Sequence, residues 1–166
     1  MAGGLADRPR YSFIALPELG QETVRRVPVV IVGAGPVGLT AAAELATLGH
    51  DTVLLDEDDT VSVGSRAICW AKRTLEIFDR VGAGDRMVDK GVVWNRGRLF
   101  HRDREVYSFD LLPEPGHQRP AFINLQQYYV EEYLVDRVRE LGRTDIRWRN
   151  KVVGLETLPD GGARLT

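Results

Sequence analysis

The stretch Val29-Val30-Ile31-Val32-Gly33-Ala34-Gly35-Pro36-Val37-Gly38 decides the fold. An apolar run ends in a G-x-G-x-x-G pattern, and a helix-like stretch, residues 39–48, follows at once. An acid, Asp56, ends the next apolar run, eighteen positions after Gly38. A glycine pattern alone is weakly diagnostic. This one lies at a strand-to-helix junction, and Asp56 follows at the sequence spacing typical of the acid that binds the ribose in such motifs. The context therefore predicts a dinucleotide-binding βαβ unit.

Each residue type in this unit has a physical role. Gly33 lets the chain turn sharply off the strand, Gly35 lets a pyrophosphate approach the backbone, and Gly38 lets the helix pack tightly on the strands. Pro36 suits the first helical turn, and with Val37 it begins a helix whose unpaired N–H groups attract phosphate. All five residues belong to the predicted cofactor site. The alternative is a glycine-rich turn without a ligand.

The acid at the end of the second apolar run completes the predicted site. The Asp56 carboxylate can accept hydrogen bonds from both ribose hydroxyls, and its charge disfavours a 2′-phosphate there. Glu57, the next residue, is placed in the same site. The acidic run 56–59 also suggests a cation site, but its spacing fits no metal-binding pattern, so we predict no metal.

Bulk properties exclude several classes of protein. The 166 residues suffice for one domain, with 43% hydrophobic and 28% charged residues and a net charge of −2. Nothing here indicates a nucleic-acid partner or a membrane partner, and no apolar run approaches the ~20 residues of a membrane span. The lone Cys69, expected to be buried and inert, excludes an internal disulfide. Because charged residues at 7–10 interrupt any signal-peptide core, we expect a cytoplasmic protein.

The pattern along the chain predicts an N-terminal arm, residues 1–27, laid against the domain or partly disordered. Residues 28–166 form the domain, with helices at 37–48, 71–81, 85–90 and 126–141. Strands are expected at 29–32 (buried on both faces), 52–55, 91–100, 105–109, 146–148 and 152–156. We predict hairpin turns at 95–97 and 159–162, and loops at 61–67 and 111–120. The fold class is α/β, a Rossmann-like βαβ unit with a parallel sheet followed by part of an antiparallel sheet.

Beyond the fingerprint, the chain resembles the FAD-dependent aromatic hydroxylases, the single-component flavoprotein monooxygenases related to p-hydroxybenzoate hydroxylase. Residues 28–39 look like their first strand and glycine loop, and Val53-Leu54-Leu55-Asp56 looks like their second strand, although Glu is commoner than Asp at its end. Ser65-Arg66-Ala67 looks like their arginine loop. Residues 122–134, with Gln127, Glu131 and Leu134, look like their Gln-x-x-x-Glu-x-x-Leu helix start. The resemblance runs from about Pro28 to the C-terminus.

The resemblance implies that Arg66 and Gln127 contact FAD, that NAD(P)H is the co-substrate, and that a phenolic or other small aromatic molecule is hydroxylated. It also implies that residues 28–166 are the N-terminal part of an FAD-binding domain, with 91–122 as a partial substrate-domain insertion. A guanidinium after the ribose acid can form a fork of hydrogen bonds with a pyrophosphate. The alternatives are a surface ion pair between Arg66 and the acidic run, and a helix-capping role for Gln127.

Two later flavin-binding segments of that family have no counterpart here. The 166 residues alone are therefore expected to be catalytically inactive, and their open sheet edge favours a homo-oligomer. No catalytic residue is assigned, because the flavin carries the chemistry and the three histidines are scattered, with surface positions expected for His50, His101 and His117.

Two other functions are compatible with the glycine motif. An NAD-binding Rossmann dehydrogenase is disfavoured, because the stretch after Gly91 turns to antiparallel strands where a further βα unit would be expected. A non-catalytic nucleotide-binding remnant is the other alternative. A flavin spectrum of the purified protein separates the hydroxylase from the dehydrogenase.

Overall fold

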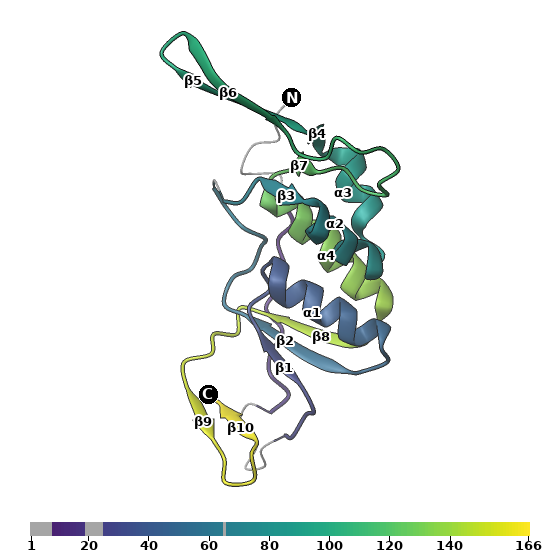
Figure 1. Cartoon of the computed structure of the whole chain (residues 1–166). Helices are drawn as coiled ribbons and strands as arrows, with labels where there is room; N and C mark the ends of the chain where they lie inside the picture. Colours follow the sequence, from purple (N-terminus) through teal and green to yellow (C-terminus); the bar gives the residue numbers. More distant parts are fainter. Residues whose placement is uncertain (1–7, 19–24, 65) are drawn as a thin grey trace.

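The computed structural model describes residues 8–18, 25–64 and 66–166 (Figure 1). Within them the helices are α1 (Pro36–Thr47), α2 (Lys72–Arg80), α3 (Gly84–Lys90) and α4 (Gln127–Leu141). The strands are β1 (Val30–Val32), β2 (Thr52–Asp56), β3 (Cys69–Ala71), β4 (Val92–Trp94), β5 (Arg96–His101), β6 (Arg104–Asp110), β7 (Phe122–Asn124), β8 (Thr144–Trp148), β9 (Leu155–Thr157) and β10 (Ala163–Leu165).

A three-stranded parallel sheet, ordered β1-β2-β8, forms the base of the domain. Helices α1 and α4 pack against each other and both contact β8, so the sheet and two helices enclose the core (Figure 1). The fully buried side chains of this core include Leu39, Leu54, Leu134 and Val138. The apolar spacing of α4 gives one buried stripe, and Gly142 ends the helix in the left-handed conformation at φ 68°.

The first strand is less buried than its composition predicts. A continuous apolar run is typical of a strand covered on both faces, yet the Val32 side chain is 56% exposed. The reason is topological: β1 is the edge strand of the β1-β2-β8 sheet, and β2 occupies its centre. The expectation of a strand buried on both faces is therefore wrong for β1.

A second, antiparallel sheet has the order β3-β7-β4, and two of its strands were not expected. Strand β3 lies between the predicted loop 61–67 and helix 71–81 and overlaps the first residue of that helix, and β7 lies between the predicted loop 111–120 and helix 126–141. Each has three residues, too few to show an alternating pattern of their own. They pair across more than fifty residues of sequence, so only the tertiary fold defines them.

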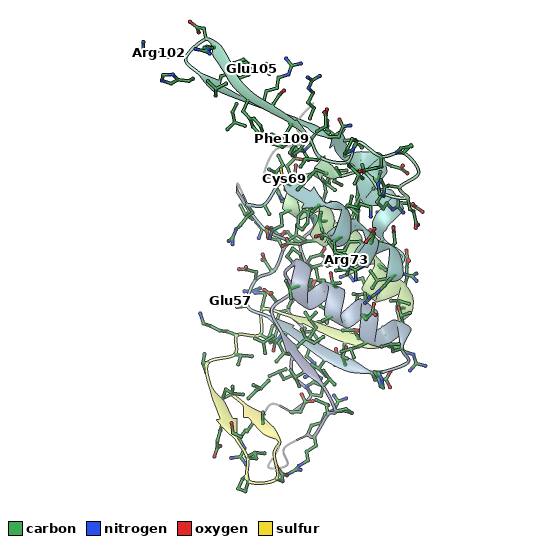
Figure 2. The ribbon with its side chains drawn as sticks, viewed as in Figure 1. Glu57, Cys69, Arg73, Arg102, Glu105 and Phe109 are labelled. Carbon is green, nitrogen blue, oxygen red and sulfur yellow. The ribbon has the colours of Figure 1, made fainter. Side chains whose placement is uncertain are left out.

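The predicted hairpin turn at 95–97 is wrong. Arg96 and Gly97 lie within β5, and the hairpin turns at Arg102, whose φ of 53° is left-handed. Gly97 serves a different purpose, because a Cβ there would lie 2.2 Å from the ring of Phe109 on β6. The β5–β6 hairpin projects from one end of the molecule, with Arg102 at its tip, and the predicted turn at 159–162 correctly joins β9 to β10 at the other end (Figures 1 and 2).

Cys69 is exposed, so the prediction of a buried thiol is wrong. Successive side chains of a strand point to opposite faces, and in β3 the indole of Trp70 takes the buried side. The Cys69 Sγ lies 3.0 Å from Asn124 Oδ1 on the neighbouring strand (Figure 2). The strand predicted at 152–156 also begins later than expected, since β9 starts at Leu155.

One arginine fastens the loop 111–120 to two helices. Arg119 donates from Nε to Asp79 Oδ2 at 2.6 Å, and its Nη2 binds both Asp79 and Asp85. Hydrogen bonds to these carboxylates raise the pKa of Arg119. Only 12% of the Arg119 side chain and 18% of the Asp79 side chain are exposed, so this pair is mostly shielded from solvent, whereas Asp85 is 86% exposed.

We expect Arg119→Ala to lower the free energy of unfolding by about 2 kcal/mol, because it leaves a mostly buried carboxylate without its bidentate partner. Arg143→Ala, which removes an exposed ion pair with Asp51, is the control and should cost less than about 1 kcal/mol. Urea unfolding of both variants measures the difference. Equal stabilities of the two variants would show that the Arg119 contacts contribute nothing beyond a surface pair.

Candidate dinucleotide-binding site

The glycine loop leaves the start of α1 open. Gly35 is the N-cap residue and makes no side-chain cap, Pro36 follows it, and the first turn carries no acidic residue. The amide N–H groups of Val37 and Gly38 lie in this first turn and have no intrahelical acceptor, whereas the Leu39 N–H donates to the Gly35 carbonyl. The helix dipole adds a partial positive charge there. Such a helix start is suited to bind an anion such as a pyrophosphate.

The three glycines differ in what a side chain would meet. Gly33 has φ 102°, a conformation that L side chains rarely adopt. A Cβ at Gly38 would lie 2.0 Å from the carbonyl oxygen of Gly33, so this position must be glycine for the loop to close on the helix. A Cβ at Gly35 would meet no atom within 4 Å. The space beside Gly35 is thus free for a ligand.

Asp56 lies beside the glycine loop because β1 and β2 run parallel and end at the same edge of the sheet. Its Oδ2 accepts the backbone N–H of Ala34, and its Oδ1 accepts the N–H of Asp58 at 2.8 Å. Each oxygen keeps a lone pair for another donor, such as a ribose hydroxyl. Asp56 therefore both fastens the loop and presents a carboxylate to the site.

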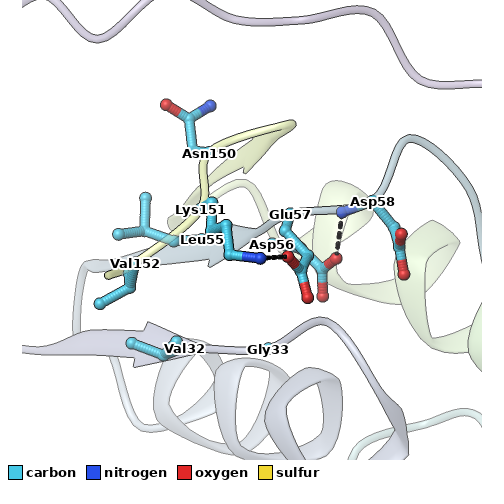
Figure 3. Close-up of a pocket in the computed structure, with 9 residues that line it drawn as sticks. All are labelled: Val32, Gly33, Leu55, Asp56, Glu57, Asp58, Asn150, Lys151 and Val152. Carbon is cyan, nitrogen blue, oxygen red and sulfur yellow. Dashed lines mark hydrogen bonds and ion pairs between the residues drawn. The ribbon is translucent and has the colours of Figure 1, made fainter. Parts of the chain in front are cut away.

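Two hollows meet at this carboxylate. The larger, about 420 Å³, brings together four residues predicted from the sequence: Gly35, Asp56, Arg66 and Gln127. The smaller, about 200 Å³, is shown in Figure 3 and is lined by Gly33, Asp56 and Glu57, with apolar walls from β1, β2 and the segment after β8. Pro36, Val37 and Gly38 line neither hollow and contribute through the helix start.

Glu57, which the sequence placed in the cofactor site, lines the smaller hollow and pairs with a lysine. Its Oε2 lies 2.6 Å from Lys151 Nζ, across the mouth of the smaller hollow (Figure 3). Both side chains are more than half exposed, so the ion pair is screened by solvent. Lys151 and Asn150, which also line this hollow, were not among the predicted residues.

Arg66 lies in the wall of the larger hollow with its side chain exposed. It forms no ion pair with the acidic residues 56–59, all of which the structure describes, so the surface ion-pair alternative is not supported. Gln127 also departs from the capping alternative, because the N-cap of α4 is Gln126 and no side chain caps that helix. Its Oε1 instead accepts the Ala67 N–H at 3.2 Å, next to Arg66.

We expect Arg66→Ala to weaken FAD binding by about 1.5–3 kcal/mol, the range for hydrogen bonds to charged groups, with little change in apo melting temperature. Arg104→Ala, an exposed change on the β5–β6 hairpin, is the control. Fluorescence titration with FAD measures both. A large loss of apo stability with unaltered FAD affinity would contradict the assignment of Arg66 to the site.

A buried carboxylate that the sequence did not single out as a site residue organises the floor of the larger hollow. Glu131 is 2% exposed, and its two oxygens accept the Ser62 N–H and the Ser62 hydroxyl, each at 2.6 Å. Gln127 Nε2 donates to Glu131 Oε1 at 2.7 Å and to Ser62 Oγ at 2.9 Å. The i, i+4 spacing of Gln127 and Glu131 was visible in the sequence, but their partner Ser62 lies in a loop without a pattern.

The residues that the structure describes contain no group of three or more His, Cys, Asp or Glu side chains placed to hold a metal ion. The same residues contain no helix that is long and apolar enough to cross a membrane. His50, His101 and His117 are exposed, as predicted.

Comparison with known proteins identifies the class to which this fold and site belong. A family model described as "FAD binding domain" matches residues 26–164, so the chain belongs to this family, whose members include FAD-dependent aromatic monooxygenases. The resemblance seen in the sequence is thereby confirmed. FAD is the family's cofactor, and the predicted α/β fold with a parallel sheet and antiparallel sheets is confirmed as well.

Individual relatives agree with this assignment. A flavin-dependent monooxygenase of Mycobacteroides abscessus is 32% identical over 140 residues, which cover 80% of this chain and 29% of that protein. A para-nitrophenol 4-monooxygenase of a Pseudomonas species is 30% identical over 146 residues, covering 81% of this chain and 36% of that protein. The crystal structure of the flavin-dependent monooxygenase PieE with FAD and substrate superposes with a TM-score of 0.69 at 26% identity, covering 85% of this chain and 28% of PieE. The chain thus spans about a third of the length of these relatives.

Proposed function

We propose that this chain supplies the ADP-binding part of an FAD-dependent monooxygenase that uses NAD(P)H to hydroxylate a phenolic or other small aromatic substrate. The observation that carries the proposal is the open helix start at Gly35, with free space where a side chain would stand and a carboxylate beside it. Family membership supports FAD over NAD as the dinucleotide, which disfavours the dehydrogenase alternative.

The residues divide the binding of FAD among them. The N–H groups that follow Pro36 at the start of α1 would hold the pyrophosphate, and the Arg66 guanidinium would lie beside it as a cationic partner. Asp56 would accept the ribose hydroxyls, and the hollow beside Glu57 would take the adenine end. When bound, the flavin supplies hydride transfer from NAD(P)H and oxygen transfer to the aromatic ring. The chain's own residues bind and orient it.

The division of the chain into parts remains a proposal too. We propose that residues 1–27 are an N-terminal arm, that 28–166 are the N-terminal part of an FAD-binding domain, and that 91–122 are a partial substrate-domain insertion. The exposed side chains of Leu99, Phe100 and Tyr107 on the β5–β6 hairpin support a role in covering an apolar surface. Cytoplasmic location and homo-oligomer formation are kept as predictions.

A competition experiment tests the proposed site. Purified protein is titrated with FAD by flavin fluorescence, and ADP and FMN are added separately as competitors. ADP should displace FAD and FMN should not, because the assigned groups all face the ADP half. Competition by FMN equal to that by ADP, or binding of NADH tighter than of FAD, would contradict the proposal. A protein that binds no dinucleotide would contradict the proposed site as well.

The second test concerns turnover. NADPH oxidation and oxygen uptake are followed with a panel of phenols on FAD-supplemented protein. We expect no coupled hydroxylation by the 166 residues alone, because hydroxylation requires a closed site that excludes water. Phenol-dependent product formation at about 1 s⁻¹ or faster would show that these residues suffice for catalysis.

A further inference from the structure

Residues 8–11 lie outside the family match, which begins at residue 26, yet they contact the wall of the larger hollow. We call residues 8–11 the arm segment and residues 58–62 the pocket wall. The wall includes Asp58, Thr60, Val61 and Ser62, which line the hollow directly.

Hydrogen bonds join the arm segment to the pocket wall at Asp59, Thr60 and Ser62. The Tyr11 N–H donates to the Asp59 carbonyl at 2.7 Å, and the Thr60 hydroxyl donates to the Pro9 carbonyl at 2.7 Å. Arg8 Nη1 donates to the Ser62 carbonyl at 2.8 Å.

Three aromatic contacts anchor the arm segment itself. The Arg8 guanidinium lies 3.3 Å from the ring centroid of Tyr128 on α4, a cation–π contact. The Tyr11 ring stacks on Trp148 at 4.2 Å between centroids, and the Arg139 guanidinium lies 4.8 Å from the Tyr11 ring. Burial raises the pKa of the Tyr11 hydroxyl to about 12, as fits a ring packed on the core.

Ser62 is therefore held from two sides. Its N–H and hydroxyl bind the buried Glu131, and its carbonyl binds Arg8. Gln127 joins this group and also binds the Ala67 N–H, so the bonds continue to the residue next to Arg66. A loop of this kind, without strand or helix pairing of its own, needs such external bonds to keep one shape.

We propose that the arm segment, through Arg8 above all, is a positioning element that holds the pocket wall in the shape that binds FAD. This inference rests on the proposed function. The physical reason is preorganisation: a ligand binds more weakly when only a fraction of the protein has the competent loop conformation.

The test compares Arg8→Ala with Arg26→Ala in the 166-residue chain. Arg26 lies outside the arm segment, pairs with Asp160 rather than with the pocket wall, and has a side chain that is 79% exposed. If Arg8→Ala leaves about a tenth of the molecules competent, the apparent FAD dissociation constant rises about tenfold. Arg26→Ala should leave it unchanged. Arg8→Lys keeps a cation above Tyr128 and should restore most of the affinity.

Two further measurements separate positioning from mere stabilisation. Hydrogen exchange of the apo protein should become faster across residues 58–62 in Arg8→Ala, while the apo melting temperature changes little. Tyr128→Leu, which removes the ring beneath Arg8 from the α4 side, should also weaken FAD binding. It serves as the second variant if Arg8→Ala does not fold.

The outcomes are distinguishable. Wild-type protein that binds FAD, with unchanged affinity in both Arg8→Ala and Tyr128→Leu, overturns the role of the arm segment and leaves the proposed function intact. A fall in melting temperature without loss of affinity does the same. Wild-type protein that binds no FAD overturns the proposed function, and this inference with it.

Discussion

Replacing Gly35 with valine is expected to abolish FAD binding while the apo protein stays folded. The backbone at Gly35 has φ −77° and ψ −178°, which any residue adopts, and a Cβ there meets no protein atom within 4 Å. The new side chain would occupy the space that the pyrophosphate needs at the start of α1. Losing a glycine N-cap costs the apo protein about 1 kcal/mol at most.

Gly38→Ala is the matched comparison. It should also lose FAD binding, but through a clash within the protein rather than by blocking the ligand's space. A Cβ at Gly38 would lie 2.0 Å from the Gly33 carbonyl oxygen, so the loop itself must move. We expect this variant to lose about 1–3 kcal/mol of stability through overpacking, along with its FAD affinity. In Gly35→Val only the affinity should fall, by at least a hundredfold, which is about 3 kcal/mol or more.

Flavin fluorescence titration and thermal melting of the two variants test whether Gly35 lies at the pyrophosphate site. If Gly35→Val binds FAD within about tenfold of the wild-type affinity, the pyrophosphate does not lie at this helix start. If its apo melting temperature falls as far as that of Gly38→Ala, the space beside Gly35 is not free in solution. Either result would remove the main support for the proposed site.

The βαβ unit could be predicted from sequence because its signals are local. The glycine loop, the apolar run before it and the acid after the next run lie within thirty residues, and each has a defined stereochemical role. The helix α4 was equally accessible, since Val130, Leu134 and Val138 repeat at helical spacing and are all fully buried. These elements needed no knowledge of distant contacts.

The predictions were wrong at positions whose structure depends on contacts with residues far away in the sequence. Gly97 looked like a turn residue, but its role is to admit the ring of Phe109 from the opposite strand. Cys69 looked buried between Ile68 and Trp70, but a three-residue strand that pairs with β7 turns its thiol outward. In both cases local composition favoured one answer, and a pairing across the fold imposed another.

The candidate site divides in the same way. Gly35, Asp56, Arg66 and Gln127 could be predicted, and the structure brings them to one hollow. The groups that hold them in place could not, because Ser62 and the arm segment carry no motif. Their importance comes only from what they touch: Ser62 binds Glu131, and Arg8 binds Ser62.

The second large effect is expected at Glu131. Glu131→Ala would remove the acceptor of three hydrogen bonds at a position with 2% exposure, and would leave the Ser62 N–H, the Ser62 hydroxyl and the Gln127 amide without their partner. Unsatisfied buried donors and the cavity left by the side chain together cost about 3 kcal/mol. In a domain of this size that lowers the melting temperature by roughly 6–12 °C.

The adjacent Glu132 is the matched control on the same helix. It is only partly buried, it forms no ion pair with the described residues, and burial raises the pKa of its carboxyl. Its charged form is therefore disfavoured by the fold, and Glu132→Ala should cost little stability. FAD affinity should fall in Glu131→Ala alone, because the pocket wall loses its bonds to α4. Equal melting temperatures of the two variants would mean that Glu131 does not hold Ser62 in solution, and the pocket wall would then need another anchor.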